Sequence, residues 1–333
     1  MHEINIIGDK SISHRAAILG AMAEGTTEIV NFGFCKDTLA TLSCLRALGI
    51  KVTRNKNNVI IRSAGYQKLK EPSNILYAGN SASTMRILMG LLAGSNFMTV
   101  LNGDNSLRAR PMKRVVLPLR EMGACIYARE DEFPPVFVKG GTLKSISYTS
   151  PIVSAQVKTA VLFAGAQADG ITTYKEPIGS RNHTELMLPY FGCKIFTDTD
   201  VKGFTFTSVK GKDNIYGQQV IVPGDFSAAS FFIAGAVLLK NNPLLIKNVG
   251  LNQTRTGLLN VLIKMGANIK IVNKYQMNAE DMGDIFVGAN GCSEMKGINL
   301  TPDMIPGIID EIPILAVCAT QVQGTTKFTG QKA

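Results

Sequence analysis

The chain has 333 residues, more than a single hydrophobic core usually supports, so its length favours two domains. Hydrophobic residues make up 45% and charged residues 18%, a balance that excludes a disordered chain. The net charge of +10 indicates an anionic partner, and because basic residues are scattered and tryptophan is absent, we expect small anions and no nucleic acid.

Five segments of the chain share one plan, in which a small polar turn precedes an apolar stretch rich in alanine and glycine, and a strand follows. We expect each apolar stretch to be a buried helix, because it is apolar on nearly all sides. The segments begin at Gly8, Gly79, Ser150, Gly224 and Ile309. Their period of about 70 residues is too long for a solenoid and predicts compact subdomains of helices and strands.

A second helix is expected after each of the first four segments. Each of these helices ends at a glycine, which is typical of a left-handed C-cap: Gly49, Gly123, Gly192 and Gly266. A short β-branched strand follows each cap, as at 50–53 and 268–272. The fifth segment reaches Ala333 without a second helix, so we expect the natural fold to continue; the alternative is a five-unit protein with a degenerate end.

The polar turns are candidate anion sites, because helix N-termini offer free N–H groups and a partial positive charge. In the first turn Lys10 adds a cation and Ser11 a hydroxyl, and Arg15 follows one helical turn later. Similar turns occur at 79–86 and 154–158. A single turn of this kind is usually only a capped helix. Their recurrence at corresponding repeat positions predicts one cleft that collects anionic groups.

Three further groups of charged residues have two interpretations each. Arg108 and Arg110 are either a solvated pair or a fork for a carboxylate or phosphate. The RNHTE segment at 181–185 is either a capped helix start or part of a site. Asp310 and Glu311 lie within an apolar run, where burying carboxylates is costly unless they serve a site, so we favour a site there.

The six cysteines occur singly and only three histidines are present, so we expect reduced thiols and no metal. The N-terminus lacks the basic and apolar regions of a signal peptide. The longest uncharged apolar run, 226–239, is too short to cross a bilayer. These features predict a soluble, cytoplasmic protein.

Successive motifs resemble the signatures of the 5-enolpyruvylshikimate-3-phosphate synthases in order and spacing along essentially the whole chain. They are GDKSISHR at 8–15, GNSASTMR at 79–86, RARP at 108–111, SAQVK at 154–158, RNHTE at 181–185, GDFS at 224–227, NQTR at 252–255 and IDEIP at 309–313. The SAQVK, RNHTE and NQTR forms resemble the second, glyphosate-tolerant class of that family.

The resemblance implies an α/β fold of two similar lobes, the inverse α/β barrel, in which each lobe has three βαβαββ subdomains around buried parallel helices. We place the first lobe at 8–221 and an incomplete second lobe at 1–7 and 222–333, because the family's N-terminal strand belongs to the second lobe. The family has six subdomains, so the fifth would be cut here and the sixth missing.

The resemblance also implies a reaction, the transfer of the enolpyruvyl group of phosphoenolpyruvate to the 5-hydroxyl of shikimate 3-phosphate with release of phosphate. This step of the shikimate pathway leads to chorismate and aromatic amino acids. It proceeds by addition and elimination through a tetrahedral intermediate, without a metal or an organic cofactor. Family members are usually monomers, so we expect a monomer that binds small anions and neither nucleic acid nor membrane.

Motif by motif, the resemblance assigns residues to each substrate. The set for shikimate 3-phosphate is Lys10, Ser11, Arg15, Ser154, Gln156, Ser180, Arg181 and Asp310. Within it, Ser11 and Arg15 would hold the carboxylate, and Ser154, Ser180 and Arg181 would serve the 3-phosphate. The set for phosphoenolpyruvate is Lys10, Gly79, Asn80, Ala82, Arg110 and Gln156.

The catalytic residues implied by the resemblance are Asp310 and Lys10. Asp310 would accept the proton of the 5-hydroxyl as general base. Lys10 would contact both substrates, and so would Gln156, which would also stack against the shikimate ring.

One departure from the family pattern leads to a prediction about an inhibitor. Ala82 stands where many members carry glycine, and its methyl group should narrow the pocket beside phosphoenolpyruvate. We therefore expect reduced affinity for glyphosate, and inhibition of a completed enzyme at low micromolar glyphosate would contradict this. Ile7, where a proline is usual, is taken as neutral.

A second departure concerns activity. The family's Lys-Glu-Ser-Asp-Arg segment, a later arginine and a later lysine or its equivalent are absent from these 333 residues. We expect the chain as given to have little or no turnover, and phosphate release at a family-like rate would refute this. Two alternatives remain: a non-catalytic fragment that binds shikimate 3-phosphate, and an enolpyruvyl transferase of UDP-N-acetylglucosamine, which normally opens with Gly-x-Lys-Asn and carries a reactive loop cysteine.

Overall fold

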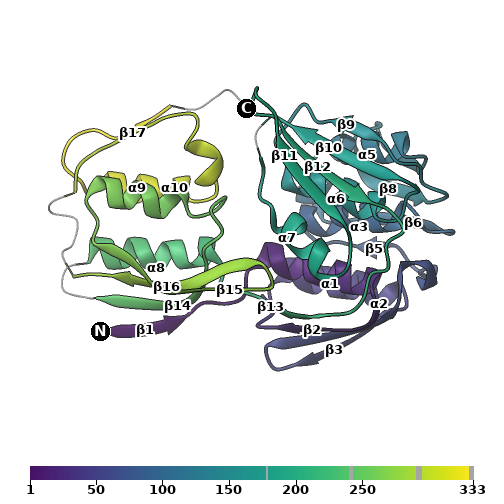
Figure 1. Ribbon diagram of the computed structural model, residues 1–333, viewed down its shortest axis with the longest axis horizontal. Helices are drawn as coiled ribbons and strands as arrows, with labels where there is room; N and C mark the ends of the chain where they lie inside the picture. Colours follow the sequence, from purple (N-terminus) through teal and green to yellow (C-terminus); the bar gives the residue numbers. More distant parts are fainter. Residues whose placement is uncertain (178, 240–242, 290–294, 330–333) are drawn as a thin grey trace. The chain divides into compact units, whose positions relative to one another are not determined.

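The structure is a computed structural model, and it describes residues 1–177, 179–239, 243–289 and 295–329 (Figure 1). The chain divides into two compact units. One unit is Lys10–Val222, and the other joins Met1–Asp9 to Pro223–Ala333. The sequence predicts a first lobe at 8–221. The compact unit begins two residues later, at Lys10, and ends one residue later, at Val222.

The Lys10–Val222 unit contains three subdomains in chain order. The first comprises α1 (Lys10–Met22), β2 (Glu24–Val30), α2 (Lys36–Ala47), β3 (Lys51–Asn55) and β4 (Asn58–Ala64). The second comprises β5 (Leu76–Tyr77), α3 (Ala82–Leu92), β6 (Met98–Asn102), α4 (Asn105–Arg108), α5 (Lys113–Glu121), β7 (Cys125–Arg129) and β8 (Phe133–Lys139). The third comprises β9 (Ser147–Thr149), α6 (Ala155–Gly165), β10 (Ile171–Glu176), α7 (His183–Tyr190), β11 (Ile195–Thr199) and β12 (Thr205–Lys210), and β13 (Gln219–Ile221) follows.

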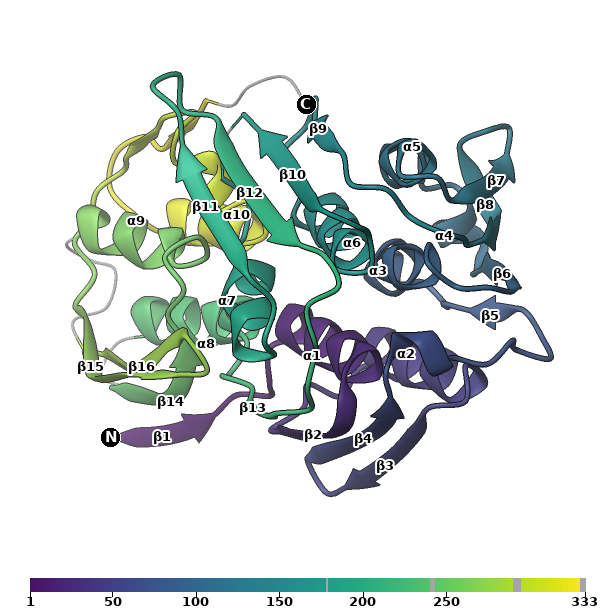
Figure 2. The ribbon, with the colours of Figure 1, turned by 45° about the vertical axis from the view of Figure 1, so that its right-hand side comes forward.

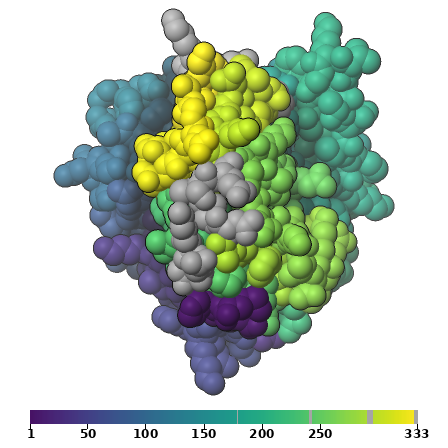
Figure 3. All heavy atoms as spheres, turned by 90° about the vertical axis from the view of Figure 1, so that its left-hand side faces the viewer, coloured from purple at the N-terminus to yellow at the C-terminus, as the bar shows by residue number. Residues whose placement is uncertain are grey.

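The other unit begins with the N-terminal strand of the chain. Its elements are β1 (His2–Asn5), α8 (Phe226–Leu238), β14 (Leu244–Gly250), α9 (Gly257–Met265), β15 (Ile269–Met277), β16 (Glu280–Val287), β17 (Asn299–Leu300), α10 (Ile312–Ala319) and β18 (Lys327–Phe328). Strand β1 pairs in parallel with β14. In the space-filling view of Figure 3 the purple residues of the N-terminal segment accordingly lie against this unit.

Four sheets of the described chain share one strand order, which accounts for the sequence repeat. The orders are β13-β2-β4-β3, β5-β6-β8-β7, β9-β10-β12-β11 and β1-β14-β16-β15. In each, the first two strands are parallel and the remaining pairs are antiparallel. Strand β13 returns to pair with β2 and so joins the end of the Lys10–Val222 unit to its beginning. The predicted α/β fold of repeated βαβαββ subdomains is confirmed.

Glycine ends the second helix of each full subdomain, as the sequence indicates. All four of these glycines adopt a positive φ, between 83° and 108°: Gly49, Gly123, Gly192 and Gly266. A side chain at such a position would strain the backbone, so glycine stops the helix and turns the chain toward the next strand.

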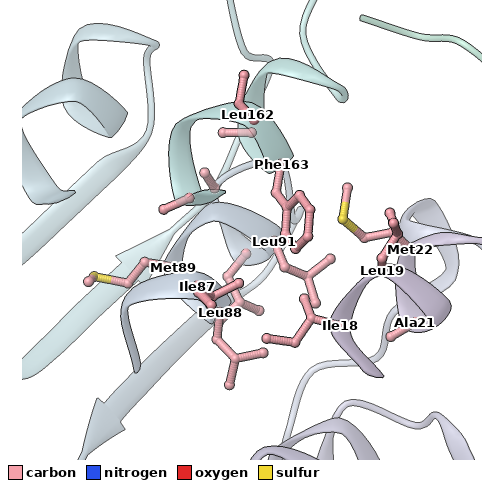
Figure 4. Packing of buried hydrophobic residues seen from close by; sticks show 14 of the residues in the cluster. Ile18, Leu19, Ala21, Met22, Ile87, Leu88, Met89, Leu91, Leu162 and Phe163 are labelled. Carbon is pink, nitrogen blue, oxygen red and sulfur yellow. The ribbon is translucent and has the colours of Figure 1, made fainter. Parts of the chain in front are cut away.

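The first helices of the three subdomains pack together in the centre of the Lys10–Val222 unit, with the three sheets outside them (Figure 2). Figure 4 shows Ile18 of α1, Leu91 of α3 and Phe163 of α6 in the shared apolar core. At Gly90 a Cβ atom would lie 2.3 Å from the backbone oxygen of Ala160, so only glycine lets α3 and α6 approach this closely. The starts of these helices are thereby held close together.

The expectation that every first helix is buried nearly all round is wrong for α8 and α10. In α8 the side chains of Phe231 and Phe232 are 61% and 51% exposed, and in α10 only Leu315 and Cys318 are buried. The described part of this unit has one full subdomain and part of another, so fewer helices surround α8 and α10 than surround α1.

Candidate functional site

Lys10 is the first residue of α1. Its Nζ lies 3.2 Å from Oδ2 of Asp37 in the first turn of α2, and half of its side chain is exposed. The hydroxyl of Thr84, in the first turn of α3, lies 3.2 Å from the backbone oxygen of Asp37. Lys10 is therefore linked through Asp37 to the N-terminal turn of α3.

Arg15 lies one helical turn beyond Ser11 and is only 3% exposed. Its Nη1 donates to the backbone oxygen of Ser11 at 3.0 Å, and its Nη2 donates to that of Ala155, the first residue of α6, at 3.3 Å. Its Nε donates to the hydroxyl of Thr184 in α7 at 2.9 Å. One guanidinium thus joins the N-terminal turns of three helices.

Gln156 connects the start of α6 to that of α3. Its Nε2 donates to the hydroxyl of Ser83 at 2.8 Å, and its Oε1 accepts from Nη1 of Arg86 at 2.7 Å. Arg86 also donates through Nη2 to the backbone oxygen of Pro111 at 2.9 Å. Because neighbouring groups hold both ends of the amide, its plane is fixed at the junction of the two helices.

The turn before α3 is held by Arg110. Its Nη2 donates to Oδ1 of Asn80 at 2.7 Å, and Nδ2 of Asn80 donates to Oδ2 of Asp104 at 2.9 Å. Gly79 has a φ of 59°, a conformation that suits glycine and leaves the turn open. Ala82, the first residue of α3, is buried beside this turn.

Several guanidinium groups interact near the start of α3. Burial, together with the charges of Arg114 and Arg110, lowers the pKa of Arg86 to about 10, so Arg86 remains charged at neutral pH. Like charges held this close repel one another, and an anion bound among them would relieve that repulsion. This repulsion between like charges therefore favours an acidic ligand near the start of α3.

Ser154 and Ser180 precede α6 and α7. Ser154 is the N-cap of α6, where its hydroxyl accepts from the backbone N–H of Val157 at 3.4 Å. Ser180 donates to Oε1 of Glu176 through its backbone N–H at 2.8 Å and through its hydroxyl at 2.9 Å. Arg181 follows it and is half-buried.

A buried ion triad lies beneath these two turns. Nζ of Lys158 is 2.9 Å from Oε1 of Glu176 and 2.6 Å from Oε1 of Glu185. The three side chains are 1%, 1% and 7% exposed. Lys158 is therefore held inside the fold by two carboxylates and is not exposed at its turn.

A second buried ion cluster surrounds Arg255 in the other unit. Its Nη1 lies 2.9 Å from Oδ2 of Asp9, and its Nη2 lies 2.7 Å from the hydroxyl of Ser227, which donates to Oε1 of Glu311 at 2.5 Å. Burial lowers the pKa of Arg255, but the neighbouring carboxylates, Asp9 first among them, outweigh burial and raise it. The cluster holds Glu311 at the start of α10.

The carboxylate pair at 310–311 is divided between two environments. Glu311 is 1% exposed, whereas Asp310, immediately before it, is exposed. The free-energy cost of burying a carboxylate therefore applies to Glu311, and the Arg255 cluster compensates that cost. Asp310 lies at the surface of its unit.

The described residues hold no group of three or more histidine, cysteine, aspartate or glutamate side chains that could bind a metal ion. Burial raises the pKa of the Cys44 and Cys193 thiols to about 12, which makes both poor nucleophiles. Cys292 lies outside the described residues. No helix of the described chain is long and apolar enough to span a membrane.

The chain matches the family model EPSP synthase (3-phosphoshikimate 1-carboxyvinyltransferase) over residues 1–333. The 3-phosphoshikimate 1-carboxyvinyltransferase of Petrotoga mobilis is 48% identical over 336 residues, which cover 99% of this chain and 76% of that protein. This chain belongs to the EPSP synthase family. The corresponding Bacillus subtilis protein is 46% identical and covers 97% of this chain, with 74% of its own length matched.

A solved structure of EPSP synthase from Acinetobacter baumannii is similar to this chain with a TM-score of 0.89 at 40% identity, covering 98% of this chain and 73% of that one. The chain thus spans about three quarters of the length of the relatives that it matches. The family match also decides the choice, left open by the sequence, against the enolpyruvyl transferases of UDP-N-acetylglucosamine.

The Lys10–Val222 unit of this EPSP synthase family member holds every predicted substrate residue except Asp310, which belongs to the other unit. Hydrogen bonds join Arg15 to the α1 and α6 turns, and Arg110 to Asn80. Gln156 is joined to the start of α3. The structure thus brings together the starts of α1, α3, α6 and α7.

Arg86, Thr184 and Glu176 were missed by the sequence reasoning as residues that contact the predicted site. Arg86 could have been found by aligning the repeats, because Arg15 and Arg86 both occupy the eighth position of their motifs, at 8–15 and 79–86. Thr184 lies within the RNHTE motif at 181–185, but its partner Arg15 is 169 residues away, and Glu176 lies outside the quoted motifs.

Proposed function

We propose that the Lys10–Val222 unit binds both substrates of the EPSP synthase reaction with the N-terminal turns of α1, α3, α6 and α7. The function of the family is the carboxyvinyl transfer to 3-phosphoshikimate in the shikimate pathway, and its substrates are small anions. The observation that carries the proposal is the set of hydrogen bonds made by Arg15 and Gln156, which tie these four helix starts together.

Shikimate 3-phosphate is assigned to the side of the unit formed by α1, α6 and α7. There Ser11 and Arg15 face its carboxylate, and Ser154, Ser180 and Arg181 face its 3-phosphate. Helix N-termini favour anions, and the fork of an arginine matches a carboxylate. Arg15 is held by bonds from three helices, so its geometry is fixed before the ligand binds.

Phosphoenolpyruvate is assigned to the turn of α3. Gly79, Asn80 and Arg110 bind phosphoenolpyruvate, and Ala82 lies beside it. Lys10 contacts both substrates. Gln156 lies between the two positions because its amide joins α6 to α3. Cations and oriented N–H groups placed here would stabilise the negative charge carried by the reacting groups.

Asp310 is assigned as the general base that accepts the proton of the 5-hydroxyl. Asp310 is exposed on its own unit, whereas Glu311 beside it is buried and accepts a hydrogen bond from Ser227. We also propose that Lys10–Val222 is the first lobe of the family fold and that the other unit belongs to its second lobe.

Calorimetric titration of the 333-residue chain with shikimate 3-phosphate, shikimate and phosphoenolpyruvate tests the binding proposal. We expect shikimate 3-phosphate to bind more tightly than shikimate. Equal affinities for shikimate 3-phosphate and shikimate would show that the assigned site does not bind the 3-phosphate. A concurrent assay of phosphate release distinguishes an active enzyme from a fragment that only binds.

Replacing Arg110 by methionine should weaken phosphoenolpyruvate binding about tenfold to a hundredfold, because one charged hydrogen bond contributes about 1.5–3 kcal/mol. The titration is made with shikimate 3-phosphate present. Arg62→Met, which removes an exposed cation from β4, is the control and should leave the affinity unchanged. An unchanged affinity in Arg110→Met would place phosphoenolpyruvate elsewhere.

The monomeric state and the cytoplasmic location stay predictions. Sedimentation velocity over a range of concentrations would test the first, and a single species of 35.9 kDa is expected.

A further inference from the structure

Buried charged side chains bind both backbone polar groups of Ser180, its N–H and its C=O. Its backbone N–H donates to Oε1 of Glu176 at 2.8 Å. Its backbone oxygen accepts from Nζ of Lys158 at 3.2 Å, and Lys158 itself lies 2.9 Å from the same Glu176 oxygen. Glu185, at the start of α7, lies 2.6 Å from Lys158 and completes the triad.

The hydroxyl of Ser180 is the part of this residue that can change partners most easily. It donates to Oε1 of Glu176 at 2.9 Å, next to the backbone bond. Because the N–H and the C=O fix the backbone separately, rotation of the hydroxyl alone can redirect its hydrogen to a ligand oxygen. Glu176 would then still accept from Lys158 and from the backbone of Ser180.

We propose that Glu176 is a positioning residue for the phosphate of the substrate, and that the Lys158–Glu176–Glu185 triad fixes Ser180 so that its hydroxyl can turn from Glu176 to a phosphate oxygen. This inference rests on the proposed assignment of Ser180 to the 3-phosphate. Glu176 itself touches no substrate, since it is 1% exposed and lies beneath Ser180.

The triad is suited to positioning because its three side chains are almost fully buried. A hydrogen bond to a charged group in such surroundings is stronger than one at the surface, and the three side chains have little freedom to move. Oε2 of Glu176 and Oε2 of Glu185 have no hydrogen-bond partner among the described residues, so Oε1 is the atom through which Glu176 acts.

The test compares the affinities for shikimate 3-phosphate and shikimate, because their ratio isolates the phosphate. Glu176→Ala removes the acceptor and is expected to lower this ratio at least tenfold. Glu176→Asp withdraws the acceptor by one methylene but keeps the charge beside Lys158, and should lower the ratio about threefold to tenfold. Glu176→Gln keeps an oxygen at the same position and should restore the ratio to within about threefold of the unchanged protein.

Lys175→Ala is the matched control, because Lys175 neighbours Glu176 in β10 but pairs with Asp200 at 3.4 Å. It should leave the ratio unchanged. Melting temperatures identify any variant that fails to fold, in which case Glu176→Asp decides the question. An unchanged ratio in the folded Ala or Asp variant, or an equal loss for both ligands, overturns the inference. Equal binding of the two ligands by the unaltered chain instead defeats the assignment of the phosphate site.

Discussion

Replacing Arg255 by methionine is expected to lower the free energy of unfolding by about 3–5 kcal/mol, because it removes one member of a buried ion cluster. Arg255 is 4% exposed, and its partner Asp9 is 5% exposed. Without the guanidinium, Asp9 would lose its buried ion pair with Arg255, and Ser227, which donates to Glu311, would lose its hydrogen bond from Arg255. Urea denaturation followed by circular dichroism measures the loss, and hydrogen exchange shows whether it falls on the Met1–Asp9 and Pro223–Ala333 unit.

The control for Arg255 is Lys274→Met in the same unit. Lys274 lies 3.0 Å from Oδ2 of Asp281, but its side chain is 55% exposed. A pair of this kind contributes at most about 1 kcal/mol, so this variant should unfold almost like the unaltered chain. If Arg255→Met lost no more stability than Lys274→Met, the cluster would not be what holds Glu311 at the start of α10.

The second large effect is expected in ligand binding. Arg15→Met should weaken the binding of shikimate 3-phosphate by at least about thirtyfold, because truncating one partner of a buried charge pair costs about 2–5 kcal/mol. The loss has two causes. The carboxylate of the ligand loses the guanidinium group that would bind it. The turns at Ser11 and Ala155 lose the side chain that joins them. Calorimetry with shikimate 3-phosphate measures the change.

Arg15→Lys separates charge from geometry. Lysine keeps the positive charge but cannot reproduce a planar fork that reaches several acceptors at once, so we expect an affinity between those of Arg15→Met and the unaltered chain. Arg62→Met again serves as the surface control. Wild-type affinity in Arg15→Met would show that the ligand carboxylate lies away from α1.

Features that are encoded over short stretches could be predicted from the sequence. The repeated helices, their glycine caps and the following strands each depend on residues within about one turn or one strand of each other. The positive φ at Gly49 and Gly266 is an example, since the chain must reverse direction there after an apolar helix. Helix α1 likewise begins at Lys10, where the sequence pattern indicates a helix start.

The partners of the charged side chains could not be predicted in the same way. Arg15 and Thr184 are 169 residues apart, and Arg255 and Asp9 are 246 apart. Such pairs meet because the chain returns on itself, with β13 pairing with β2 and β1 pairing with β14. The residues around each strand do not indicate which strand it pairs with.

The sequence by itself therefore determined the subdomain repeat and the positions of the helix starts, and it predicted the residues suited to bind anions there. Only the tertiary structure decided which charges are used inside the fold, as with Lys158 and Glu311, and which remain at a surface, as with Asp310. The physical reason is that burial and pairing depend on what packs above a side chain, and neighbouring residues in the chain, such as Asp310 and Glu311, can face opposite environments.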